Sequence, residues 1–195
     1  MRGRGQDTHV RRNYAECVRV RLVDHDPAWR ERFATERDRI RTASGEGLLG
    51  VFHVGSTAVE DLAAEPVVDV LAVYQDYGAA RDAADALVEW GYDRRRDDPD
   101  WPVLSRTEVE PVVIHLRPRA AETWRDHLVF RELLRDNPDA RAEYERAKRE
   151  TASDHPDDVA AYTDAENEKI RSLEDRAYEE GYGKCVPAFD GKDDA

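Results

Sequence analysis

Apolar positions near the start of the chain follow first a strand period and then a helix period. In residues 17–23, "CVRVRLV", valine and leucine alternate with arginine, which predicts a half-buried strand. In residues 24–44, Trp29, Phe33 and Ile40 fall on one face at helical spacing, and the proline before them suits a first helical turn. This second segment therefore predicts an amphipathic helix.

Three later runs are short, apolar and rich in β-branched residues, which is typical of core strands. They cover residues 48–54, 65–74 and 110–118. Between the last two runs the chain predicts, in order, a helix at 77–92, a charged loop at 93–100 and a short strand at 101–108.

From Glu122 to about Ala177 the pattern is helical, with a break at Asn137-Pro138. The chain therefore predicts an α+β fold, a mixed β-sheet flanked by helices with a helical C-terminal part. Its 195 residues suffice for one domain of ordinary size. We place that domain at 17–180, between a flexible basic arm at 1–16 and a flexible tail at 181–195.

The charge balance is strongly acidic, with 43 Asp and Glu against 30 Lys and Arg and a formal net charge of -13. Nucleic acids and anionic membranes are held mainly by Lys and Arg, so general binding to either is not expected. Arginine greatly outnumbers lysine, and Ala and Val replace bulky apolar residues, as in proteins adapted to high salt. We therefore expect a halophilic source, with most carboxylates on the solvated surface.

The cysteines and the hydrophobic segments favour a cytoplasmic protein. Cys17 and Cys185 lie near opposite ends of the chain and lack metal-ligand spacing, so neither a disulfide nor a metal framework is expected. No apolar segment approaches the length of a membrane span, and the first ten residues have no hydrophobic core for a secretory signal.

Residues 51–70, "VFHVGSTAVEDLAAEPVVDV", combine a turn and a carboxylate in a way that suits phosphate chemistry. Gly55 permits a tight turn, and Ser56 and Thr57 offer hydroxyls and amides that suit a phosphate. Asp69 follows on the next strand, thirteen positions after Ser56. A carboxylate beside a phosphate-binding turn suits Mg²⁺, which bridges protein and nucleotide oxygens.

Each of these residues also has a structural interpretation. Ser56 and Thr57 could satisfy the turn through side-chain-to-backbone bonds, and Asp69 could cap a turn or pair with His53 or an arginine. His115, on the last of the three apolar runs, is either a site residue that points toward a polar cleft or a satisfied structural histidine. Both interpretations stay open.

Six segments carry a resemblance to a known family. They are "VDHDPAWRERFATE", "HVGSTAVEDLAAEPVVDV", "EWGY", "VVIHLRP", "WRDHLVFRELLRDNPDARAEYERAK" and "AAYTDAENEKI", and together they cover roughly residues 20–178. In this order they resemble the GrpB (UPF0157) family, a branch of the polymerase-beta-like nucleotidyltransferase superfamily. The resemblance implies a nucleotidyltransferase-like fold in which a Gly-Ser turn holds triphosphate and carboxylates on two strands hold a divalent metal.

Carried onto this chain, the resemblance implies that Gly55 and Ser56 grip the nucleotide and that Asp69 is the first metal carboxylate. The superfamily's second carboxylate falls at Leu71, and its third falls where this chain has His115, which would position water or substrate as a catalytic residue. Two-metal phosphoryl chemistry normally needs more acidic ligands than one. The resemblance therefore leaves open whether the chain is an enzyme.

Four further positions follow from the resemblance. Arg131 and Lys148 match basic positions of the family and would meet phosphate oxygens if the helices fold over the sheet; otherwise such an arginine pairs with a neighbouring glutamate. At Glu65 and Glu166 we expect lysine in relatives, and glutamate there would repel a phosphate. Either salt adaptation replaced these lysines without functional meaning, or the site has lost anionic ligand binding.

The leading hypothesis is a nucleotidyltransferase-like protein that binds a nucleotide or another phosphorylated small molecule with Mg²⁺ and transfers a nucleotidyl group. No organic cofactor is evident. The alternative is a catalytically degenerate ligand-binding or protein-interaction module. Because related domains occur fused to dephospho-coenzyme A kinase, the resemblance also implies a link to coenzyme A metabolism.

Overall fold

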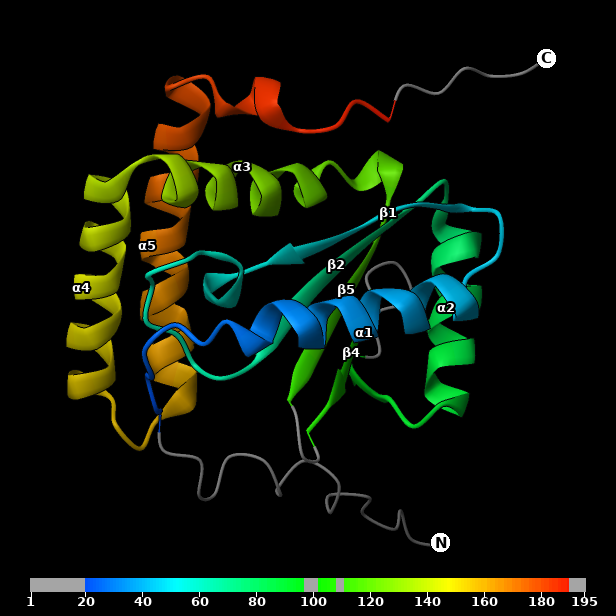
Figure 1. Ribbon diagram of the computed structural model, residues 1–195, viewed down its shortest axis with the longest axis horizontal. Helices are drawn as coiled ribbons and strands as arrows, with labels where there is room; N and C mark the ends of the chain where they lie inside the picture. The colour runs from blue at the N-terminus through cyan, green and yellow to red at the C-terminus, as the bar shows by residue number, and fades with distance from the viewer. Residues whose placement is uncertain (1–19, 97–101, 108–110, 190–195) are drawn as a thin grey trace, which may run out of the picture.

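The computed structural model describes residues 20–96, 102–107 and 111–189, which form a β-sheet with helices on both faces (Figure 1). The α-helices are α1 (Ala28–Ala43), α2 (Tyr77–Glu89), α3 (Thr123–Asp136), α4 (Pro138–Asp154) and α5 (Val159–Glu179). The strands are β1 (Leu48–Val54), β2 (Val68–Tyr74), β3 (Asp93–Arg96), β4 (Val103–Arg106) and β5 (Val112–Pro118). Short 3-10 turns are η1 (Ser56–Ala58), η2 (Arg119–Ala121) and η3 (Tyr182–Cys185). The expected α+β fold is confirmed.

The sheet is mixed, and its described strands lie in the order β1-β2-β5-β4-β3. β2 and β5 pair in parallel, whereas the other neighbours pair antiparallel. In this register Asp69 lies opposite Val54 on β1 and Val113 on β5, and Leu71 lies opposite His115. Because side chains alternate along a strand and paired residues share a face, all five point to the same side of the sheet.

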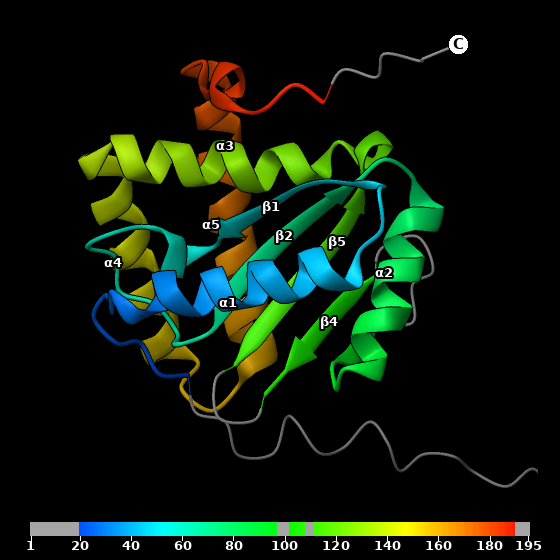
Figure 2. The same cartoon turned by 45° about the vertical axis from the view of Figure 1, so that its right-hand side comes forward.

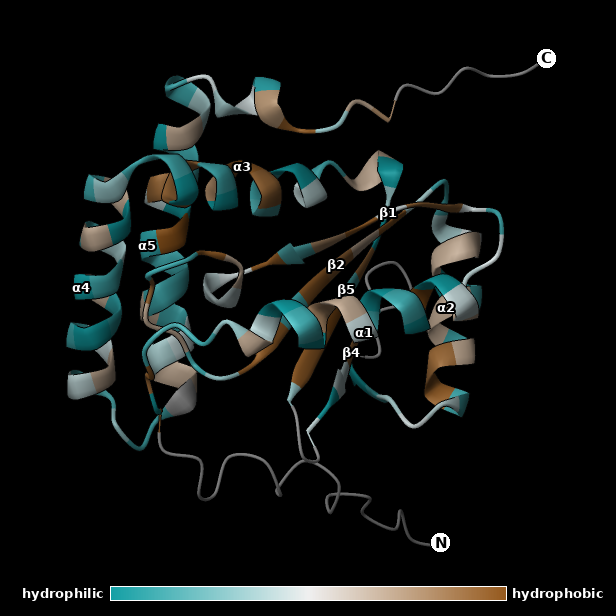
Figure 3. Ribbon diagram, viewed as in Figure 1, coloured by the Kyte–Doolittle hydropathy of each residue, from teal (hydrophilic) through white to brown (hydrophobic). Residues whose placement is uncertain are grey.

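The two faces of the sheet pack against different helices (Figure 2). Val70 and Ala72 are buried in a cluster with residues of α1 and α2. Leu71 and Val73, which alternate with them, pack with Trp124 of α3. Figure 3 shows the strands as the most hydrophobic part of the molecule, as expected for a sheet covered on both sides.

The helical C-terminal part forms a second packing unit, at the left of Figure 1. The break at Asn137-Pro138 separates α3 from α4, and the Asn137 side chain accepts hydrogen bonds from the amides of Asp139 and Ala140. This is a standard N-terminal cap with proline in the first turn. Leu133, Tyr144 and others from these helices share one buried cluster with Val59, which follows η1. The helices therefore lie against the turn that carries Ser56.

Two sequence predictions are wrong. In the described part of 17–23 only an isolated bridge forms, between Val23 and Ala64, because the segment runs along the loop before β2 instead of joining the sheet. The charged segment 93–100 begins with strand β3, and its remaining residues lie outside the described part. Charged side chains are compatible with β3 because it is the edge strand, where charge protects an unpaired edge.

The segment assigned to a tail packs on α3 as far as Phe189. The Tyr182 hydroxyl donates to Asp136 (2.9 Å), and the Phe189 ring lies 5.1 Å from the Trp124 ring. The arm at 1–16, Cys17 and residues 190–195 lie outside the described residues. In the described ranges, no helix is both long and apolar enough to cross a membrane.

Candidate functional site

The turn after β1 requires glycine and brings the Asp69 carboxylate against it. Gly55 has φ 69° and ψ -174°, a conformation that side chains other than hydrogen disfavour. A Cβ at this position would lie 2.7 Å from Asp69 Oδ2. The absence of a side chain at Gly55 therefore allows the Asp69 carboxylate to lie directly against the turn.

Asp69 and His115 meet on adjacent strands, on the face that α3 covers. His115 Nε2 lies 3.6 Å from Asp69 Oδ1, and both side chains are partly exposed, at 20% and 33% respectively. Leu71, at the position expected for a second carboxylate, is fully buried and packs with Trp124. A carboxylate at this position would lie in the hydrophobic core.

A second histidine, His127 on α3, completes this cluster and was missed by sequence reasoning. Its ring lies 5.1 Å from the His115 ring. Burial, together with the nearby His115 and Arg117, lowers the pKa of His127 to about 3. His127 is therefore neutral at neutral pH, and only its place in the quoted segment "WRDHLVFR" could have drawn attention to it.

The fit of this cluster to a metal ion is limited. Within the residues that the structure describes, no group of three or more His, Cys, Asp or Glu side chains is placed to hold a metal. Mg²⁺ is usually held by one or two carboxylates together with substrate phosphates and water. Asp69 fits the part of the single carboxylate, provided that a phosphorylated ligand supplies further oxygens.

On one side of the turn, Ser56 enters a buried ionic network centred on Lys148. Lys148 Nζ donates to Ser56 Oγ (3.0 Å), Glu65 Oε2 (2.8 Å) and Glu166 Oε1 (2.9 Å). An ammonium group has three N–H donors, so this geometry uses all of them. The Tyr144 hydroxyl donates to the same Glu166 oxygen (2.7 Å).

The protonation states of this network are fixed by its own charges. Burial by itself lowers the pKa of Lys148, but Glu166 and Glu65 outweigh it, and the pKa is raised. Burial likewise raises the pKa of Glu65, but Lys148 outweighs it, and the pKa is lowered. Lys148 and Glu65 are therefore held in their charged forms by the network itself.

The two glutamates that depart from the expected lysines thus belong to one structural feature. Glu65 precedes β2 and Glu166 lies on α5, and both contact Lys148. Lys148, predicted to bind phosphate, is 2% exposed and neutralised by two carboxylates.

On the other side of the turn, Thr57 points away from Ser56 and contacts His53. His53 Nε2 and Thr57 Oγ1 are 3.0 Å apart, and the His53 ring stacks on Phe33 at 4.9 Å. Burial, Arg135 and Arg131 lower the pKa of His53 to about 3. Ser56 and Thr57, although adjacent in the sequence, therefore belong to different surroundings: Ser56 contacts the Lys148 network, and Thr57 contacts His53.

Arg131, the other predicted phosphate ligand, is occupied elsewhere. Its Nη1 donates to the His53 carbonyl oxygen (2.9 Å), and its Nε and Nη2 contact Glu132. The side chain is 13% exposed. It joins α3 to the end of β1, and no contact to Ser56 or Asp69 is present among the described residues.

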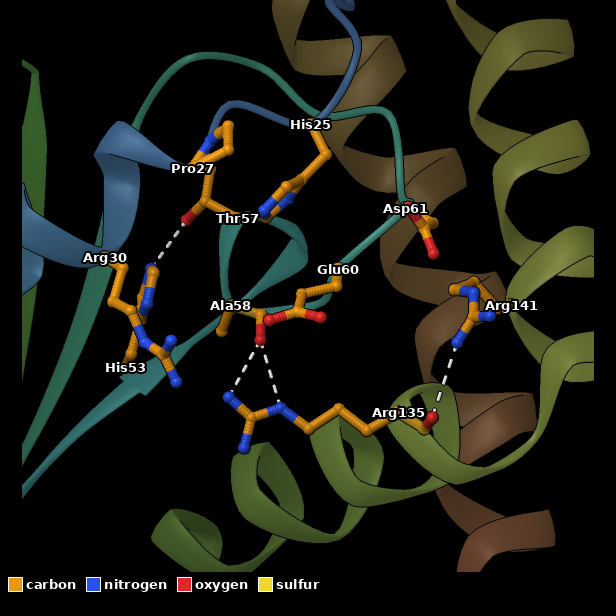
Figure 4. A pocket seen from close by; sticks show the side chains of 10 residues that line it. All are labelled: His25, Pro27, Arg30, His53, Thr57, Ala58, Glu60, Asp61, Arg135 and Arg141. Carbon is orange, nitrogen blue, oxygen red and sulfur yellow. Dashed lines mark hydrogen bonds between the residues drawn. The ribbon is translucent and has the colours of Figure 1, made fainter.

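A cavity of about 780 Å³ lies on the Thr57 side of the turn (Figure 4). Its lining residues come from the loop before α1, α1 itself, β1, η1 and the residues that follow, α3 and α4: His25, Pro27, Arg30, His53, Thr57, Ala58, Glu60, Asp61, Arg135 and Arg141. Asp69, His115 and Ser56 do not line it. The cavity and the predicted phosphate site are thus two places on either side of one turn.

Comparisons with known proteins agree on the family. The model of the GrpB protein family matches residues 19–176. A UPF0157 protein of Streptomyces coelicolor is 35% identical over 162 residues, which cover 83% of this chain and 86% of that protein. The crystal structure of the conserved protein GrpB from Enterococcus faecalis has a TM-score of 0.74 and 26% identity, and the match covers 82% of this chain and 98% of that one.

Two weaker likenesses concern proteins with named activities. A dephospho-CoA kinase of Mycolicibacterium paratuberculosis is 29% identical over 188 residues, which cover 82% of this chain and 46% of the kinase. The poly(U) polymerase Cid1 has a TM-score of 0.48 and 12% identity, over 74% of this chain and 49% of the polymerase. A likeness as slight as the second supports no conclusion about activity.

Proposed function

The chain belongs to the GrpB family, and we propose that it binds a nucleotide or another phosphorylated small molecule at the Gly55 turn, with a divalent metal on Asp69, for transfer of a nucleotidyl group. One observation carries the proposal: the glycine turn, the Asp69 carboxylate and the His115 imidazole lie together on one partly exposed face. A turn for phosphate beside a carboxylate for a metal is the arrangement that this chemistry needs.

Each residue has a defined part in this proposal. The turn amides and the Ser56 hydroxyl would hold phosphate oxygens, Asp69 would hold the metal, and His115 would position the substrate or water. Lys148 donates to Ser56 Oγ and thereby holds that hydroxyl in a fixed position at the turn. Lys148 and Arg131 have their donors engaged, so we assign both to positioning: Lys148 orients Ser56, and Arg131 holds α3.

Calorimetric titration with ATP, GTP, CTP and UTP, with Mg²⁺ or Mn²⁺ in high potassium chloride, tests the proposal. We expect metal-dependent binding of at least one nucleotide to the wild type and its loss in Asp69→Asn. The matched control is Asp82→Asn, an exposed aspartate on α2. Absence of binding with every nucleotide, or equal binding in Asp69→Asn, would contradict the assignment of the metal to Asp69.

A second candidate function, ligand binding without catalysis, is favoured by the single carboxylate at the turn and by the two carboxylates that pair with Lys148. It predicts a nucleotide or phosphorylated ligand that binds without metal and is unaffected by Asp69→Asn. Incubation with α-labelled nucleotide and a panel of hydroxyl acceptors separates the two candidates, since only a transferase moves the label.

The likeness to a dephospho-CoA kinase supports a narrower version of either candidate, in which the ligand is a coenzyme A precursor. Thermal shift with dephospho-coenzyme A and phosphopantetheine tests this version. A rise in the unfolding temperature that exceeds the rise with equal concentrations of inorganic phosphate would support it, and equal rises would exclude it.

A further inference from the structure

The cavity beside Thr57 gathers positive charge in a protein whose net charge is -13. Three arginines and two histidines line it. Figure 4 shows Arg30 and His53 on one side, from α1 and β1, and Arg135 and Arg141 on the other, from α3 and α4. Four segments that are distant in sequence therefore direct cationic or hydrogen-bonding side chains to one hollow.

The charges of these arginines are not neutralised. The Arg30 guanidinium forms neither a hydrogen bond nor an ion pair within the described part of the chain; only the Arg30 backbone amide is bonded, to the Pro27 oxygen. Arg141 donates to the backbone oxygens of Leu134 and Arg135, which are uncharged. Arg135 donates to the Ala58 oxygen at 3.0 and 2.8 Å, and its one ionic contact, with Glu132, is long at 3.5 Å.

The acidic residues of the cavity offset this charge only from a distance. Glu60 and Asp61 belong to the lining, but neither forms an ion pair with a lining arginine in the described structure. Burial lowers the pKa of Arg135, and repulsion from Arg131 and Arg30 adds to this effect, which attraction to Glu132 and Glu60 only partly offsets. Uncompensated cations that repel one another are stabilised when an anion lies between them.

The lining also contains His25, which adds a polar side chain to the cavity. His25 Nδ1 is buried and has no hydrogen-bond partner in the described structure, although its ring packs edge-on against Trp29. Figure 4 shows the His25 ring directed from its loop toward Thr57. The volume of about 780 Å³ lies within the range of roughly 300–1,000 Å³ typical of sites for small organic ligands.

We propose that this cavity is a second ligand site, which binds the phosphate group of a small molecule through Arg30, Arg135 and Arg141, on the opposite side of the turn from Asp69. Guanidinium groups bind phosphate through paired N–H donors, and the Arg30 guanidinium donates to none of the residues that the structure describes. The proposal does not depend on the function proposed for Asp69 and His115, and it requires no metal.

The test is NMR of protein labelled at its 6 histidines, titrated with metal-free pyrophosphate at constant ionic strength. We expect saturable shifts of the His25 and His53 signals and none of His115 or His127, which lie on the Asp69 side. Arg30→Gln should weaken pyrophosphate binding by about tenfold, the usual effect of losing one charge-assisted contact. The matched control, Arg41→Gln, removes an exposed arginine from the same helix and should leave binding unchanged.

Several outcomes would overturn the proposal. Shifts confined to His115 and His127 would place the anion at the Asp69 side instead. Equal weakening in Arg30→Gln and Arg41→Gln would mean attraction by overall charge rather than a site. Malonate provides the second arm: tighter binding of this dicarboxylate than of pyrophosphate would reject phosphate as the ligand group. No shift of His25 and His53 with either probe would reject an anion site altogether.

Discussion

The two sides of the Gly55 turn handle positive charge in opposite ways. On the Ser56 side, Lys148 is buried and meets two carboxylates, a serine hydroxyl and a tyrosine-linked network. On the Thr57 side, Arg30, Arg135 and Arg141 line a cavity. Among the described residues, the guanidinium groups of Arg135 and Arg141 meet backbone oxygens and, at 3.5 Å, Glu132, and that of Arg30 meets no partner. One turn of three residues thus separates a buried network of paired charges from a group of arginines that lack carboxylate partners at short distance in the described structure.

This difference shows which cations are available to a ligand. A buried cation must be paired, because an isolated charge in the interior costs many kcal/mol. Lys148 is paired with two glutamates of the protein itself, so a phosphate would have to displace one of them to contact the ammonium group. The arginines of the cavity retain contact with solvent and keep their charge without such partners, so a phosphate can approach them directly.

The largest predicted loss of stability follows from replacing Lys148. Lys148→Met should leave Glu65 and Glu166 partly buried without their cation and should lower the free energy of unfolding by about 3–5 kcal/mol. Urea denaturation in high salt measures this loss. The control is Lys169→Met, which removes a more exposed pair with Glu143 and should cost no more than about 1 kcal/mol.

A rescue variant tests whether unpaired charge causes the loss of stability in Lys148→Met. Adding Glu65→Gln and Glu166→Gln to Lys148→Met removes the stranded charges and should recover most of the lost stability. A triple variant that is no more stable than Lys148→Met would show that lost packing, and not unpaired charge, causes the effect.

The next effect concerns the turn that separates the two sides. Gly55→Ala should lower the free energy of unfolding by about 1–3 kcal/mol, because φ is 69° and the added Cβ would meet Asp69 Oδ2 at 2.7 Å. Chemical denaturation of both variants compares it with Gly45→Ala, where nothing lies within 4 Å of the added Cβ. Equal stability of the two alanine variants would refute the close approach of the turn to Asp69.

A smaller effect follows from the buried histidine on the cavity side. The pKa of His53 in the folded protein is about 3, below its ordinary value of 6.5. Between these values the unfolded chain takes up a proton and the folded protein does not, so stability falls as pH falls below about 6.5, by up to about 1.4 kcal/mol per pH unit. His127 contributes in the same direction.

His53→Gln tests this prediction, because it removes the titrating ring and keeps a hydrogen-bonding group for Thr57. Urea denaturation from about pH 7.5 to 5.5 should show a shallower loss of stability in the variant than in the wild type. Identical slopes would mean that His53 takes up its proton in the folded protein as readily as in the unfolded chain.

How far sequence reasoning reached depends on the distance between the interacting residues. Period and spacing located the helices, the core strands, the Gly55 turn and Asp69, because each is encoded within a few neighbouring positions. The strand expected at 17–23 was wrong, since alternation alone does not show whether a sheet edge is available. The edge strand β3 was overlooked because its residues are charged.

The parts of the site that sequence reasoning missed are those that tertiary packing creates. Lys148 meets Glu65, 83 positions away, and Glu166 on another helix, so neither glutamate could be assigned a partner beforehand. His127 joins His115 only because α3 crosses that face of the sheet. Likewise, the different partners of Ser56 and Thr57 depend on the 3-10 turn, which the sequence did not predict.

The smallest predicted change in stability follows from replacing Arg30, and it tests directly whether the two sides of the turn differ. Because the Arg30 side chain has no partner in the described structure, Arg30→Gln should change the free energy of unfolding by less than about 0.5 kcal/mol in buffer without phosphate. With pyrophosphate present, the wild type should gain stability by mass action and the variant should gain less.

Arg135→Gln, in contrast, is expected to lower the free energy of unfolding in buffer alone, since it also removes two hydrogen bonds to the Ala58 oxygen. Thermal unfolding with and without pyrophosphate distinguishes these cases: a large loss in Arg30→Gln without ligand would place Arg30 in the same structural class as Lys148, and the two sides of the turn would no longer differ.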